Sequence, residues 1–64
     1  MVTLQEFRIR LDVVEAILWD MEYMVPTGDV LIDTSANTII FNLKELVRDL
    51  QYKIDRLAEV EQDE

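Results

Sequence analysis

The sequence predicts an all-α fold, an antiparallel two-helix hairpin that dimerises into a four-helix bundle. Three observations predict it: an apolar repeat in the first 25 residues, a Pro-Thr-Gly-Asp turn, and a second apolar repeat after it. Apolar residues at alternating spacings of three and four are typical of packed helices. We expect one small domain over 1–64, with helices at about 3–25 and 35–60, a turn over 26–34 and an acidic tail over 61–64.

The first helix has a start signal, a repeat and a stop signal. Thr3 is a favourable N-cap, and Glu6 three residues later completes a capping box. Pro26 disfavours helical geometry at the residue before it, so the helix should end near Val25. The apolar seam between these limits consists of Leu4, Phe7, Leu11, Val14, Leu18, Met21 and Val25.

The first helix also has apolar residues outside this seam. Ile9, Val13, Ala16 and Ile17 follow another side, and we expect Trp19, Tyr23 and Met24 to continue it. A helix that packs on a single neighbour needs only one apolar stripe. Two such hairpins packed together would bury both sides, which predicts a homodimeric four-helix bundle.

The second half supports two predictions. Apolar residues recur at helical spacing from Ala36 to Val60, which favours one long helix capped near Asp33, Thr34 or Ser35. The rival prediction is an α+β fold with a short β-hairpin at about 30–41, because Thr38 to Ile40 are β-branched.

In that rival fold, Val30–Ile32 and Thr38–Phe41 form the strands, and Asn42 caps a shorter helix. An isolated two-stranded hairpin is only marginally stable in water. The uninterrupted helical periodicity therefore favours the long helix.

Composition excludes several classes of protein. The 64 residues include no Cys and no His, so disulfides and the common zinc sites are impossible, and we expect no cofactor and no metal. The net charge of −8 argues against direct binding to nucleic acid or to an anionic membrane. No apolar run is long enough to span a membrane, and the absence of Cys fits a cytoplasmic protein.

The acidic residues are unevenly distributed. The interval between Arg10 and Lys44 contains six acids and no base. Asp20 and Glu22 lie near the end of the first helix, where the helix dipole disfavours anions, so they do not serve helix stability. Trp and Tyr are enriched at the centres of interfaces, so Trp19 and Tyr23 are expected to face either a second copy of this chain or a basic site on another protein. The predicted partner-binding residues are therefore Trp19, Asp20, Glu22, Tyr23, Asp29, Asp33, Asp12 and Glu15.

No catalytic constellation is visible. His and Cys are absent, Ser35 is the only serine, and a single Gly28 cannot form a phosphate-binding loop. The sequence instead predicts a small non-enzymatic interaction module that self-associates and binds a basic site on a partner protein, as inhibitor, adaptor or regulator.

Two alternative functions fit the same composition. One is an inhibitor that imitates nucleic acid and blocks a DNA- or RNA-binding enzyme, by analogy with small acidic anti-restriction and anti-CRISPR proteins of phages and mobile elements. The other is a structural spacer that holds subunits together.

Overall fold

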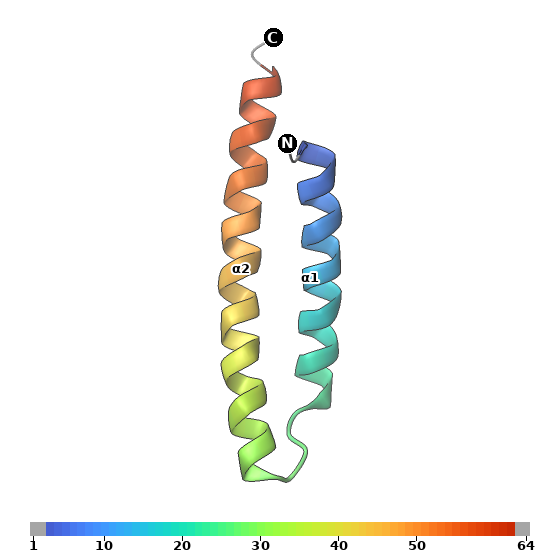
Figure 1. Cartoon of the computed structure of the whole chain (residues 1–64), viewed down its shortest axis with the longest axis vertical. Helices are drawn as coiled ribbons and strands as arrows, with labels where there is room; N and C mark the ends of the chain where they lie inside the picture. Colours follow the sequence, from blue (N-terminus) through green and yellow to red (C-terminus); the bar gives the residue numbers. More distant parts are fainter. Residues whose placement is uncertain (1–2, 63–64) are drawn as a thin grey trace.

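The chain forms an antiparallel hairpin of two helices. The computed structural model describes residues 3–62, in which α1 (Leu4–Met24) and α2 (Val30–Gln62) lie side by side and run in opposite directions (Figure 1). The molecule measures 53 × 18 × 15 Å, and α2 continues past the start of α1. The predicted all-α hairpin is confirmed.

The limits of α1 agree with the sequence signals. The side-chain oxygen of Thr3 accepts a hydrogen bond from the Glu6 backbone N–H at 3.2 Å, which is the Thr3 half of the predicted capping box. Val25 adopts an extended backbone conformation and ends the helix before Pro26, because proline disfavours helical geometry at the preceding residue.

The interface between the helices is a pair of heptad seams. All seven predicted seam residues of the first helix are buried or half-buried, and Leu18 is the most deeply buried. On α2, Ala36, Ile40 and Ile54 are buried at positions that belong to one heptad stripe. No side chain among the described residues is completely buried. The single hairpin therefore has a thin core.

The start of α2 corrects the predicted boundary. The helix begins at Val30 rather than near residue 35, and its cap is Asp29 instead of Asp33, Thr34 or Ser35. The Asp29 carboxylate oxygen Oδ1 accepts hydrogen bonds from the N–H groups of Leu31 at 2.9 Å and Ile32 at 3.1 Å. These two bonds satisfy donors that the first helical turn leaves without a partner, which explains the earlier start.

The rival β-hairpin prediction is wrong. Residues 30–41 are helical throughout, and Asn42 lies inside α2 rather than at a cap. The backbone of residues 61–62 continues α2, so the first half of the predicted acidic tail is helical; residues 63–64 lie outside the described part. The predicted turn over 26–34 is shorter than expected, since its second half belongs to α2.

Removing the Asp29 cap should destabilise the hairpin measurably. We expect Asp29→Ala to lower the free energy of unfolding by about 1 kcal/mol, because two N–H groups lose their acceptor. This corresponds to a fall in Tm of about 5 °C for a chain of this size, measured by circular dichroism. Asp29→Ser is the control and should retain most of the stability. An unchanged Tm in Asp29→Ala would show that the cap contributes nothing.

Candidate interaction surfaces

The turn uses two of the predicted partner-binding residues for its own structure. Asp29 caps α2, and Asp33 on the first turn of α2 holds the loop before it. The Asp33 carboxylate accepts hydrogen bonds from the Thr27 N–H and hydroxyl, both at 2.8 Å, and from the Gly28 N–H at 3.4 Å. Gly28 has φ +94°, a conformation that residues with a Cβ rarely adopt. The turn is therefore specified by its own residues.

Asp33 should make the turn sensitive to acid. Hydrogen bonds from the backbone and side chain of Thr27 lower the pKa of its carboxyl below the ordinary value. Because the folded pKa is depressed, the contribution is present above the unfolded pKa and is lost as the pH falls below about 4. In thermal melts, Asp33→Asn should lower Tm at neutral pH, and its difference from the natural chain should shrink towards pH 3.

A matched variant isolates this effect from the other carboxylates. Asp55→Asn removes an exposed acid on α2, far from the turn. The Tm difference between this variant and the natural chain should not follow the pH dependence seen for Asp33→Asn. Equal pH profiles for the two variants would contradict the assigned role of Asp33.

Five of the eight predicted site residues share one side of α1. Because a helix advances by about 100° per residue, positions separated by three, four, seven or eleven residues lie close together around it. The contact of Glu22 with α2 shows that this side of α1 borders the second helix, because the Glu22 carboxylate lies 3.8 Å from the Lys44 ammonium. The aromatic members are exposed, Trp19 to 63% and Tyr23 to 94%. We call this side the acidic aromatic face; it consists of Asp12, Glu15, Trp19, Glu22 and Tyr23.

Asp20 does not belong to this face. It lies two residues from Glu22, and a two-residue step turns the helix by about 200°, so the two carboxylates leave α1 on nearly opposite sides. The same geometry separates Trp19 from Ile17. The expectation that Trp19 and Tyr23 continue the apolar side formed by Ile9, Val13 and Ile17 is therefore wrong.

A second surface, which we call the apolar flank, lies on the other side of the hairpin. It combines exposed side chains of both helices. Within each helix these side chains are separated by four, seven or eleven residues, which keeps them on one side of that helix. Each is between 43% and 53% exposed, although all are large and apolar. The apolar flank consists of Ile9, Val13, Ile17 and Met24 of α1 and Ile32, Ile39 and Leu46 of α2. The exposed Asp20 lies on the same side of α1, three residues from Ile17.

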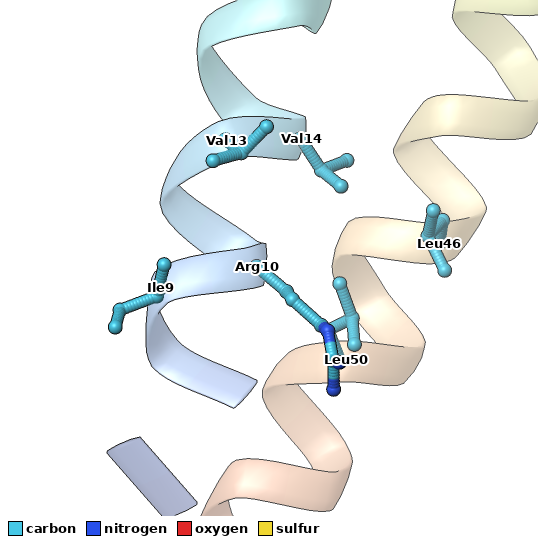
Figure 2. Close-up of a pocket in the computed structure, with 6 residues that line it drawn as sticks. All are labelled: Ile9, Arg10, Val13, Val14, Leu46 and Leu50. Carbon is cyan, nitrogen blue, oxygen red and sulfur yellow. The ribbon is translucent and has the colours of Figure 1, made fainter. Parts of the chain in front are cut away.

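A shallow groove between the helices joins the two halves of the apolar flank. It has a volume of about 310 Å³ and is lined by Ile9, Arg10, Val13 and Val14 of α1 and by Leu46 and Leu50 of α2 (Figure 2). The Arg10 side chain reaches towards α2, and its guanidinium is the only charged group of the lining. The groove establishes that Val13 and Leu46, which belong to different helices, face the same side.

The α2 half of the apolar flank is a feature that sequence reasoning missed. Ile32, Ile39 and Leu46 are spaced by seven residues and lie beside the buried seam of the same helix. Ile39 and Leu46 belong to the single apolar run that was predicted from Ala36 to Val60, and Ile32 was predicted only as part of the rival strand. A separate search for a second seven-residue stripe could have found them, because two heptad stripes on one helix indicate two packing partners.

The acidic side chains do not gather into a metal site in the described part of the chain. Among the side chains of residues 3–60, no three acidic groups approach closely enough to hold a metal ion, and no buried polar atom lacks a hydrogen-bond partner. Within residues 3–62, neither helix combines the length and the apolarity that crossing a bilayer requires. Comparisons with protein-family models, with curated proteins and with solved structures find no match.

Proposed function

We propose that this chain is a small non-enzymatic interaction module that dimerises through the apolar flank and binds a basic site on a partner protein through the acidic aromatic face. The observation that carries the proposal is the apolar flank, to which both helices contribute. Monomeric proteins rarely expose contiguous apolar surface of this extent. A role as inhibitor, adaptor or regulator fits this arrangement.

The size of the apolar flank suits a dimer. The 21 residues of α1 extend for about 30 Å, and two adjacent helices are about 20 Å wide. Two copies packed through this side would bury about 1,200 Å² in total, above the roughly 1,000 Å² that a specific interface needs. The second copy would also cover the thin core of the hairpin. Because a chain this short cannot build a large core of its own, this covering would stabilise its folded state.

The acidic aromatic face remains accessible in such a dimer because it lies on the other side of α1. Lys44 contacts one of its three carboxylates, that of Glu22, and Arg8 lies on the same side of α1, four residues before Asp12. Trp19 and Tyr23 add large amphipathic side chains that are often central to protein interfaces. A partner with a basic surface that also offers apolar contact is therefore the best complement to this face.

Self-association is tested by sedimentation equilibrium over a wide concentration range. We expect a mass of twice 7.6 kDa at high concentration and a Tm that rises with concentration, because association stabilises the folded chain. A chain that sediments as a monomer at every concentration overturns this part of the proposal.

Partner binding is tested by capture from host lysate at low and high salt, with matched variants as bait. Asp12→Asn with Glu15→Gln removes charge from the acidic aromatic face, and Trp19→Ala with Tyr23→Ala removes its aromatic groups. Asp49→Asn with Asp55→Asn is the control for charge loss on α2. We expect both face variants to lose the same partner and the control to keep it. Release of that partner by added DNA or RNA would instead support imitation of nucleic acid.

A further inference from the structure

We infer that a hollow at the turn end of the hairpin, which we call the turn hollow, binds an arginine side chain of the basic partner. The turn hollow has a volume of about 290 Å³ and is lined by Val25, Pro26, Asp33 and Asn37. No residue of this lining is basic, so an incoming cation meets no like charge there. The inference rests on the proposed function and adds the place and the side chain by which the partner is held.

The turn hollow adjoins the acidic aromatic face. Asn37 precedes Lys44 by seven residues, so the two lie on one side of α2. Lys44 in turn contacts Glu22, which belongs to that face. Phe41 lies between them on the same side of α2 and is 61% exposed, which adds a third aromatic group. A partner that covers the acidic aromatic face can therefore also reach the turn hollow.

Asp33 keeps part of its acceptor capacity for a ligand. A carboxylate offers about four lone-pair sites. The Oδ1 oxygen accepts both hydrogen bonds from Thr27, whereas Oδ2 accepts only the Gly28 N–H among the described residues, at 3.4 Å. The hydrogen bonds from Thr27 lower the pKa of the Asp33 carboxyl, which is therefore charged at neutral pH. Oδ2 can thus accept a charge-assisted hydrogen bond from a cation while Oδ1 continues to hold the turn.

The end of α1 attracts a cation to the same place. This helix ends beside Val25, and its last carbonyl groups have no partner within the helix. The N–H groups of residues 27–29 do not serve them, because they donate to Asp33 and to the Thr27 hydroxyl. The last turn of α1 also contains no basic residue. The negative end of the helix dipole therefore lies at the turn hollow without a cation of its own.

An arginine side chain matches both the apolar and the polar parts of the turn hollow. Its methylene groups can pack on Val25 and Pro26 while its charged head stays at the polar groups. The guanidinium has five N–H donors in a planar fork. This fork suits acceptors of different origin, which here are the Asp33 carboxylate, the Asn37 amide oxygen and the carbonyl groups that end α1. A lysine ammonium is a compact point charge and would use fewer of them.

Nuclear magnetic resonance with a small probe tests the turn hollow. N-acetyl-arginine methylamide is titrated into the whole isotope-labelled chain at about 0.15 M salt, which screens attraction between exposed charges. We expect saturating chemical-shift changes at the Thr27 and Gly28 N–H groups and at the Asn37 side-chain amide. The matching citrulline compound carries an uncharged urea group in place of the guanidinium and should leave these signals unchanged.

Two variants of Asn37 should change the Kd of the probe in opposite directions. Asn37→Lys places a competing ammonium in the turn hollow and should weaken binding about tenfold, whereas Asn37→Asp adds a carboxylate and should tighten it about threefold. Asn37 is exposed and takes no part in the hydrogen bonds that hold the turn, so both variants should keep the circular dichroism of the natural chain. Gln51→Lys makes the same charge change at another exposed position of α2 and should leave the Kd unchanged.

The outcomes separate this inference from the proposed function. Shift changes of equal size at Asp12 and Glu15 would overturn the inference, because they indicate attraction to the acidic surface in general. Equal weakening by Asn37→Lys and Gln51→Lys would overturn it in the same way, and both results leave a basic partner possible. In lysate capture, loss of the partner by Asn37→Lys but not by Gln51→Lys supports the inference, whereas the absence of any captured partner removes the proposed function on which it rests.

Discussion

Replacing Leu18 with aspartate is expected to unfold the hairpin at room temperature. Leu18 is the most buried residue of α1, with 7% of its surface exposed, and it lies in the seam that faces α2. An unpaired buried carboxylate typically costs about 3–5 kcal/mol. Small domains have a total stability of roughly this size, so the folded state should be lost.

Far-ultraviolet circular dichroism measures the outcome as a loss of the helical signal. Leu18→Met is the control, because a swap of similar volume in an apolar core usually costs less than about 1.5 kcal/mol. A Leu18→Asp variant that keeps the helical signal and the Tm of the natural chain would show that the seam is not the core.

The first helix could be predicted in detail because its signals are local and agree with one another. The Thr3 cap, the heptad seam and Pro26 each concern one segment, and each has its expected consequence in the structure. Leu18 illustrates this, since its spacing from Leu11 and Met21 places it in the seam, where it is buried.

The start of α2 could not be predicted in the same way because several residues compete for the cap. Asp29, Asp33, Thr34 and Ser35 are all favourable N-caps. Val30 to Ile32 added to the ambiguity, since they are apolar but exposed and resemble a short strand in sequence. The choice depends on the turn, in which Asp33 binds Thr27 and Gly28 and so cannot itself act as the cap.

The candidate surfaces were predicted only in part because proximity in sequence is not proximity on a helix. Trp19, Asp20, Glu22 and Tyr23 are consecutive or nearly so, yet Asp20 leaves α1 on another side from Glu22. The apolar flank needed information from both helices at once. Only the groove, which brings Val13 and Leu46 to one side, shows that their stripes form one surface.

Replacing Ile17 with aspartate is expected to dissociate the dimer and to leave the helices of the hairpin largely intact. Ile17 is 46% exposed in the single chain, so its carboxylate can reach water in the monomer. In the proposed dimer it lies in the interface, where its carboxylate would lose water without gaining a partner and would add to the charge of Asp20 one helical turn away. Removal of water from an unpaired charge opposes association strongly.

We expect the dimer Kd of Ile17→Asp to rise by at least about 100-fold, equivalent to about 2.8 kcal/mol, measured by sedimentation equilibrium. Its Tm should become independent of concentration, in contrast to the natural chain. Gln51→Glu is the control, because it adds a negative charge to an exposed position away from the flank and should leave the Kd unchanged.

The contrast with Leu18→Asp makes this prediction specific. The two residues are neighbours in sequence, but they lie about 100° apart around α1. The same substitution should therefore unfold the chain at position 18 and only separate the copies at position 17. Equal loss of helical structure in both variants would mean that the hairpin folds only as a dimer, whereas an Ile17→Asp dimer of natural affinity would place the interface elsewhere.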